Sequence, residues 1–477
     1  MISARGSMGT SEERHILYYL NLAKNNGSNL WQDTELEYEQ IIHAWNILTQ
    51  DSEDADDKRS ELILKFIWST QKYQKIRGLW QDQIVWCQRG LLAARLLKDN
   101  AEEMKLLNNI GYCSEELGLP VVALENYNQA LLLLDTTNSH PAQRGVIFNN
   151  IATVYYGLGD MAKSLDYFMQ SLAIHKSSGP RQAVARALNN IGQIHNNLGE
   201  WQKALEYLEQ SLAIREEIDD QYGKAVTLNN IGQIYDNTGE YKRALDYYQN
   251  SLVIRRKIGD RDGEATVLIN IGTTHGNLNQ WQTSLEYYFE ALQIFRETQN
   301  RFGEADTLNN IGSAYDNLDD IEHGVQYLEE VLQIYQSLKN IQGEAATLNN
   351  IGTARQRQGK NKQALTYYQK ALVLWKQINH KQYEASTLSS IGVVYGELKS
   401  NKKALSHHEQ ALSIRQTIGD RVGEAMSLFN IATILERQAK FEGAKEFFEK
   451  ALSIDIELNT TNIQRDMDAL ERLEKRK

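Results

Sequence analysis

The chain has 477 residues, of which 42% are hydrophobic and 24% charged, and its formal net charge is −11 at pH 7. No stretch approaches the roughly 18 apolar residues that a membrane-spanning helix needs. The acidic excess argues against a general nucleic-acid binder, because affinity for phosphates requires clustered Lys and Arg. The two cysteines, Cys87 and Cys113, exclude a disulfide framework and a cysteine-rich metal site, which favours a cytoplasmic location.

The first sixty residues, 1–60, are predicted to form an N-terminal tail and a helical cap. No apolar signal core occurs at the N-terminus. Residues 15–24 and 35–48 have helical spacing and are separated by a polar loop. The acidic run at 51–57 is expected to be a solvated loop.

Residues 61–100 are predicted to be a degenerate copy of the repeat that fills the rest of the chain. Gly78, Trp80 and Trp86 match the turn and the second helix of that repeat. Gln83 stands where the repeat has a small residue, so this copy departs from the pattern at a packing position.

Nine repeats of about 40 residues follow in residues 101–460, and a C-terminal capping helix is expected at 461–477. The tetrad Asn-Asn-Ile-Gly, or a variant of it, begins at Asn108, Asn149, Asn189, Asn229, Ile269, Asn309, Asn349, Ser389 and Phe429. The first step is 41 residues and every later step is 40. Such a register predicts a repeat architecture.

Each repeat is predicted to be a pair of helices. Leu228, Ile231 and Tyr235 fall at i, i+3 and i+7, on one face of a helix. After a break at 238–239, a second apolar stripe runs through residues 241–254. One pair cannot bury its apolar faces alone, so neighbouring pairs must stack.

The repeat resembles the tetratricopeptide repeat (TPR), whose motif reads W-x2-L-G-x2-Y, then A-x3-F, then P. The matching residues of one repeat are Leu228, Ile231, Gly232, Tyr235, Ala244 and Tyr248. The first aromatic and the final proline are missing, and the longer period is similar to that of kinesin light chain, of the G-protein regulator LGN and above all of bacterial TPR arrays. The resemblance implies an all-α, right-handed TPR superhelical solenoid with a helical N-terminal cap.

The N-terminal hundred residues resemble the helical segment that joins the ATPase to the TPR array in bacterial STAND (NB-ARC-type) signalling proteins. No Walker A sequence occurs in the chain. The resemblance therefore implies a sensor part without its ATPase, or a free-standing relative. A cap that covers the open end of the solenoid is the alternative.

Carboxamides recur on the first helix of each repeat, which lines the concave surface in TPR arrays. They suit hydrogen bonding to an extended peptide backbone, and the resemblance to kinesin light chain and LGN implies the same use. The candidate groove residues are Asn189, Asn190, Gln193, Asn197, Asn229, Asn230, Gln233, Asn237, Asn270, Asn277, Asn309, Asn310, Asn317 and Asn349.

Two roles stay open for the second Asn of each pair, represented by Asn150, Asn190 and Asn230. It either faces the groove or bonds to the backbone of the adjacent repeat and fixes the stacking. For the first Asn of each pair, and for the Asn seven residues after the second, we favour the groove.

The polar stripe changes in the seventh repeat to Arg355, Gln356 and Arg357. Arginine presents a fork that suits carboxylates. We therefore expect an acidic side chain or a chain terminus of the partner near Arg357. A salt bridge to a neighbouring helix, for example through Glu397 or Glu436, is the alternative.

No catalytic, metal or cofactor site is expected. The histidines at repeat positions, His195, His275, His407 and His408, are predicted to be packing residues, and residues 259–265 to be a helix cap. The sequence predicts a non-catalytic scaffold that binds a protein or an extended peptide, and neither nucleic acid nor membrane. The alternatives are the ligand-sensing part of a STAND-type signalling or defence switch, and self-association through the solenoid.

Overall fold

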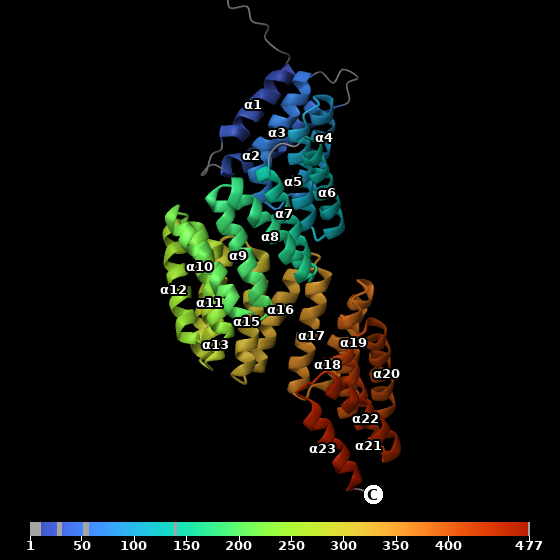
Figure 1. Cartoon of the computed structure of the whole chain (residues 1–477). Helices are drawn as coiled ribbons and strands as arrows, with labels where there is room; N and C mark the ends of the chain where they lie inside the picture. Colours follow the sequence, from blue (N-terminus) through green and yellow to red (C-terminus); the bar gives the residue numbers. More distant parts are fainter. Residues whose placement is uncertain (1–10, 26–30, 51–56, 138–140, 476–477) are drawn as a thin grey trace, which may run out of the picture. The chain divides into compact units, whose positions relative to one another are not determined.

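The structure is a computed structural model that describes residues 11–25, 31–50, 57–137 and 141–475 (Figure 1). Within these ranges, every regular element is an α-helix. No helix in the described ranges is long and apolar enough to cross a membrane. The predicted tail at 1–10, and residues 51–56 of the predicted acidic loop, lie outside the described residues.

The chain divides into two compact parts, an N-terminal part up to residue 234 and a C-terminal part from residue 235. The helices of the N-terminal part are α1 (Ser11–Asn25), α2 (Trp31–Thr49), α3 (Asp57–Ile76), α4 (Trp80–Leu96), α5 (Asn100–Glu116), α6 (Pro120–Thr137), α7 (Pro141–Gly157), α8 (Met161–Ser178), α9 (Arg181–Asn197), α10 (Trp201–Glu217) and most of α11 (Gln221–Asn237). Those of the C-terminal part are α12 (Tyr241–Ile258), α13 (Arg261–Asn277), α14 (Trp281–Glu297), α15 (Arg301–Asn317), α16 (Ile321–Ser337), α17 (Ile341–Arg357), α18 (Asn361–Gln377), α19 (Lys381–Glu397), α20 (Asn401–Ile418), α21 (Arg421–Arg437), α22 (Phe441–Glu457) and α23 (Ile463–Glu474).

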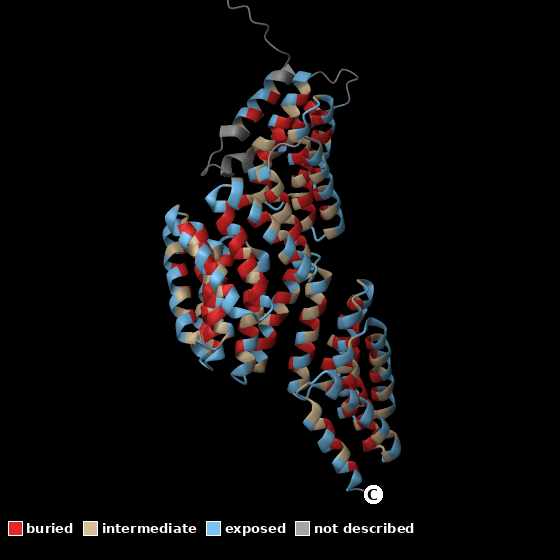
Figure 2. Cartoon of the chain, viewed as in Figure 1, coloured by how far each residue is buried: buried red, intermediate tan, exposed pale blue. Residues whose placement is uncertain are grey.

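Within each part the helices pack in consecutive pairs. An odd-numbered helix, called the first helix, packs against the even-numbered second helix that follows it, and pairs stack in sequence order. Buried residues gather where the helices meet (Figure 2). The glycine of the motif allows the two helices of a pair to approach closely. The ring of Tyr288 lies on Gly272, where a Cβ atom would come within 2.7 Å of the ring.

The N-terminal helices share a core with the degenerate repeat. The rings of Trp45 on α2 and Trp86 on α4 stack with their centroids 4.3 Å apart, and Ile41 and Phe66 are fully buried beside them. Helices α1 and α2 include the two N-terminal stretches predicted to be helical. The division into domains at residues 60, 100 and 460 stays a prediction.

The turns between pairs are built from left-handed residues and side-chain caps. Gly259 ends α12 with φ +71°, and the Asp260 carboxylate accepts the Gly263 N–H (3.1 Å) at the start of α13. The segment 259–265 thus caps a helix in the manner predicted.

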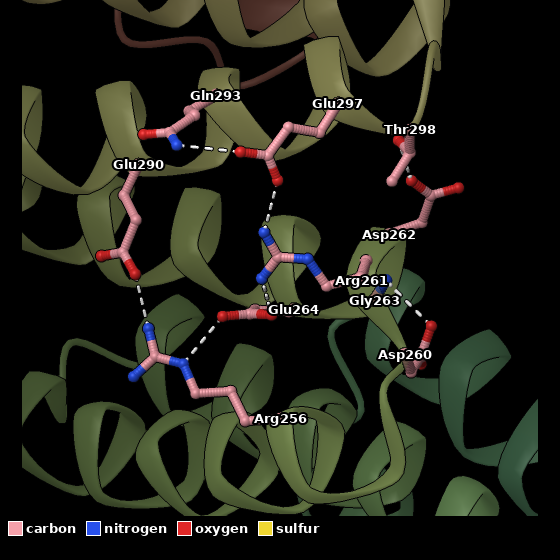
Figure 3. A network of polar contacts seen from close by, with 10 residues as sticks. All are labelled: Arg256, Asp260, Arg261, Asp262, Gly263, Glu264, Glu290, Gln293, Glu297 and Thr298. Carbon is pink, nitrogen blue, oxygen red and sulfur yellow. Dashed lines mark hydrogen bonds and ion pairs between the residues drawn. The ribbon is translucent and has the colours of Figure 1, made fainter.

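A charged network joins three consecutive helices of the C-terminal part (Figure 3). Glu264 on α13 is only 5% exposed at its side chain, and it accepts Arg256 Nε (2.8 Å) and Arg261 Nη1 (2.6 Å). Each arginine also pairs with a glutamate on α14, Arg256 with Glu290 and Arg261 with Glu297. Glu264 is therefore the buried centre of the network, and the glutamates on α14 are its exposed rim.

The substitution Glu264→Gln is expected to lower the free energy of unfolding by about 1–2 kcal/mol. A neutral amide loses two charge-assisted bonds, and the cost is moderated because both arginines are half exposed. Chemical denaturation measures the loss. The control Glu290→Gln removes one exposed ion pair and should cost less than about 0.5 kcal/mol; equal losses in the two variants would contradict the central role of Glu264.

Candidate functional site

The first helices of the N-terminal part enclose a hollow of about 450 Å³. Its lining residues come from α3, α5, α7 and α9, the first helices of four consecutive pairs. We call it the α5 hollow, because half of its lining residues lie on that helix. The exposed faces of the first helices are therefore concave at this place.

The α5 hollow is lined mainly by cations and carboxamides. Lys105 and Arg186 lie in its wall, and Lys75 lies 4.3 Å from the ring centroid of Tyr112. The single acidic lining residue, Glu102, is paired with Lys105 (2.7 Å) and accepts the Trp68 indole N–H (2.6 Å). Three cations against one carboxylate make this hollow positive in a chain whose net charge is −11.

Carboxamide hydrogen bonds connect successive first helices of the N-terminal part. The second Asn of one repeat donates through Nδ2 to Oδ1 of the first Asn of the preceding repeat. These bonds join Asn150 to Asn108 (2.9 Å), Asn190 to Asn149 (3.2 Å) and Asn230 to Asn189 (3.1 Å). We call this row the amide ladder. Both members of the pairs Asn149–Asn150 and Asn189–Asn190 thus have an inter-repeat bond to a side chain, whereas the sequence raised a bond to the backbone.

Burial differs among the predicted groove residues. Asn189 is only 6% exposed and also accepts Thr227 Oγ1 (3.2 Å), while Asn349 exchanges bonds with Thr387 (2.9 and 3.2 Å). Partly buried are Asn190, Gln193, Asn229, Asn230, Asn270, Asn309, Asn310 and Asn349. Exposed are Asn197, Gln233, Asn237, Asn277, Asn317 and Arg357. Which of them contact a partner stays a prediction.

A second row of contacts runs along the last turn of the first helices, again between residues 41 apart. It includes Asn197 Nδ2 to the Tyr156 hydroxyl (2.7 Å), Asn277 Nδ2 to Asp236 (3.3 Å) and Gln356 Nε2 to Glu397 (2.8 Å). Burial raises the pKa of the Asp236 carboxyl. Asn317 differs, because it donates to the Ser313 carbonyl of its own helix (2.8 Å).

Arg357 belongs to this second row and pairs with Asp316 on the preceding first helix. The intramolecular partner is thus neither Glu397 nor Glu436, the two acids that the sequence suggested. Glu436 instead pairs with Arg472 on α23 (3.0 Å). An acidic group of a partner near Arg357 stays a prediction.

The histidines at repeat positions lie in packing contacts. His408 is 1% exposed, and burial lowers its pKa to about 4. His195 stacks on Tyr207, with a centroid distance of 5.4 Å, and bonds to Glu200 (2.6 Å). Among the residues that the structure describes, no group of three or more His, Cys, Asp or Glu side chains is arranged to hold a metal.

The cations of the α5 hollow were not predicted from the sequence, although a signal for them exists. Lys105 and Arg186 each stand four residues before the second Asn of their repeat, Asn109 and Asn190. On a helix this spacing puts them one turn away on the same face. Their shared register could have marked them as groove residues.

Helix pairs with a 40-residue register define a helical repeat protein. The tetratricopeptide repeat model matches residues 143–217, 223–297, 264–337, 303–377, 343–417 and 383–457, more than half of the chain. The chain belongs to the tetratricopeptide repeat family, which confirms the predicted all-α TPR solenoid.

Two solved structures show the same fold over most of the chain. A STAND signal-transduction ATPase with a tetratricopeptide repeat sensor, from Pyrococcus horikoshii, is 14% identical over 98% of this chain and 75% of that chain, with a TM-score of 0.55. The apo form of the quorum sensor NprR from B. thuringiensis is 15% identical over 76% of this chain and 98% of that chain, with a TM-score of 0.50. No curated protein matches the sequence.

Proposed function

We propose that this chain is a non-catalytic scaffold that binds a protein or an extended peptide segment along the exposed faces of its first helices. The observation that carries the proposal is the α5 hollow, where four consecutive first helices present cations and carboxamides to one concave space. Carboxamides can bond to the donors and acceptors of any peptide backbone. The two free, buried cysteines are compatible with a cytoplasmic protein.

The positive charge of the α5 hollow favours an acidic group in the partner. A net amide hydrogen bond contributes only about 0.5–1.5 kcal/mol, and association costs at least about 4 kcal/mol. Amide contacts alone would therefore bind weakly. Lys105 and Arg186 supply charge-assisted contacts, so we propose that an acidic side chain or a terminal carboxylate lies beside them.

The triple substitution Asn197→Ala, Asn237→Ala and Asn317→Ala is expected to weaken peptide binding at least tenfold and to leave the melting temperature nearly unchanged. All three side chains are exposed, so their removal costs little stability, while each can contribute about 1 kcal/mol to a bound backbone. Peptides selected from a displayed random library by the wild-type chain provide the ligand, and calorimetry measures its affinity.

The matched control removes three exposed carboxamides of second helices, at Gln249, Asn250 and Gln369. It should bind the selected peptides as the wild type does. A triple groove variant that binds equally well, or that melts far below the wild type, would contradict the proposed role of these asparagines.

A second candidate function is the sensor part of a STAND-type switch. It is favoured by the fold similarity to the STAND protein, which covers nearly the whole chain and so includes the N-terminal hundred residues. In that role, a ligand in the groove would release a separate ATPase or effector. Sequencing the full-length transcript tests it: a Walker A motif upstream in the same frame favours the switch, and an in-frame stop directly before Met1 counts against it.

A further inference from the structure

The C-terminal part contains two buried oxygen atoms that have no hydrogen-bond partner and lie on one helix. They are Oδ1 of Asn309 and Oδ1 of Asp316, both on α15. A buried acceptor without a donor costs about 1–3 kcal/mol, so such atoms are rare in folded proteins. In the N-terminal part, the amide ladder supplies a donor to Asn108, Asn149 and Asn189, whereas Oδ1 of Asn309 has none.

Two differences from the next repeat account for the missing donor at Asp316. In the next repeat, the Tyr368 hydroxyl bonds to Gln356 Oε1 (3.1 Å), and Gln356 stands 40 residues after Asp316. The residue 40 before Tyr368 is Leu328, which has no hydroxyl. Gly324 likewise stands where the next repeat has Ala364. A hydroxyl and a methyl group are therefore absent beside Asp316.

The space left by these two changes is a hollow of about 260 Å³ between α15, α16 and α17, which we call the α15 hollow. It is much larger than the about 30 Å³ that one water molecule occupies. Asn309 and Asp316 both line it, and Ile321 and Leu328 form apolar wall. Ser313 and Thr353, which also line it, are exposed on the first helices, so the hollow opens toward the proposed binding face.

The charged and polar groups of the α15 hollow favour a ligand that donates hydrogen bonds. Asp316 is the only charged residue in its lining. Arg357 forms an ion pair with the Oδ2 atom of Asp316, so that Oδ1 can accept a hydrogen bond from a bound ligand. Both unpartnered atoms are acceptors. An ammonium group offers three donors and no acceptor, whereas a neutral amide would bring a carbonyl oxygen that also needs a donor.

We propose that the α15 hollow binds the side chain of a lysine in the partner segment, with the ammonium group donating to Asp316 Oδ1 and the aliphatic stem against Ile321 and Leu328. A lysine side chain has this combination of an apolar stem and a charged end. The proposal rests on the proposed function, since it assigns one side-chain site to the same binding face.

The first test uses the full chain with Nα-acetyl-lysine methylamide as the probe, and the norleucine analogue as its control. We expect crystals soaked with the lysine probe to show the ammonium at Asp316, and nothing ordered with norleucine. The variant Leu328→Tyr introduces the tyrosine that the next repeat has at this register, Tyr368, and should exclude the probe. A hollow that holds only water in the wild type, or a probe that binds Leu328→Tyr unchanged, would overturn the proposal.

The second test separates this proposal from the proposed function. Peptides selected by the wild-type chain should carry lysine at one fixed position, and Leu328→Tyr should lower their affinity at least tenfold, with Gln249→Ala as the unaffected control. Selected peptides without a preferred lysine would overturn the lysine site and leave the peptide scaffold standing. A library that yields no peptide, while the probe still binds, would contradict the scaffold alone.

Discussion

Alanine at position 189 is expected to lower the free energy of unfolding by about 2 kcal/mol, whereas alanine at position 309 should change it by less than about 0.5 kcal/mol. Asn189 accepts two hydrogen bonds, from Thr227 and Asn230, and its loss leaves both donors without this partner. Asn309 holds a buried oxygen with no partner, so its removal deletes an uncompensated group. Asn189 and Asn309 occupy equivalent positions in their first helices. Replacing either of them by alanine therefore gives the same gain in helix propensity.

Hydrogen exchange of the amides in α9 and α15 measures the two effects locally, which suits a repeat array whose parts unfold separately. Exchange in α9 should accelerate in Asn189→Ala, and exchange in α15 should hardly change in Asn309→Ala. Equal losses of protection in the two variants would mean that the amide ladder contributes no more than an asparagine outside the ladder does.

Acidification from pH 6.5 to 4 is expected to destabilise the C-terminal part by about 3 kcal/mol through His408. Burial lowers the pKa of this imidazole to about 4, and the neighbouring Arg415 and His407 lower it further than burial alone would. The imidazole of His408 therefore binds a proton at about pH 6.5 in the unfolded chain, whereas in the folded chain it stays neutral down to about pH 4. The free energy of unfolding consequently falls as the pH drops from 6.5 to 4. Above pH 7 both states are neutral at this site, so no loss is expected there.

The variant His408→Tyr is the control for this prediction, because tyrosine stands at the same register in Tyr368. Denaturation curves of wild type and variant should diverge between pH 6.5 and 4, with the wild type losing more. Taking the difference between the two chains removes the titration of all carboxyl groups, including Asp466, whose pKa is raised to about 6 mainly by burial. If the free energy of unfolding changed with pH in the same way in both chains, the lowered pKa of His408 would be contradicted.

Much of the fold could be predicted from the sequence, because a repeat multiplies one local pattern. The apolar spacing of Leu228, Ile231 and Tyr235 fixes one helix face, and its recurrence every 40 residues fixes the stacking. The cap at Asp260 also followed from local sequence, since an aspartate before a helix accepts its first free N–H groups.

The partners of polar side chains were beyond the sequence. Asn189 and Asn230 are 41 residues apart, and only the stacked helices show that they bond. For Arg357 the sequence suggested Glu397 or Glu436, whereas the structure pairs it with Asp316. The α15 hollow could not be predicted, because it depends on how the helices pack. The sequence shows only that Gly324 and Leu328 differ from Ala364 and Tyr368, the residues at the same positions of the next repeat.

Photo-crosslinking shows whether a protein or peptide binds on the exposed faces of the first helices. A benzophenone amino acid is placed at Gln233, exposed on α11, and in a second chain at Gln249, exposed on the second helix α12. A peptide selected by the wild-type chain is expected to crosslink to position 233 and not to position 249. Crosslinks at position 249 with none at 233 would contradict it.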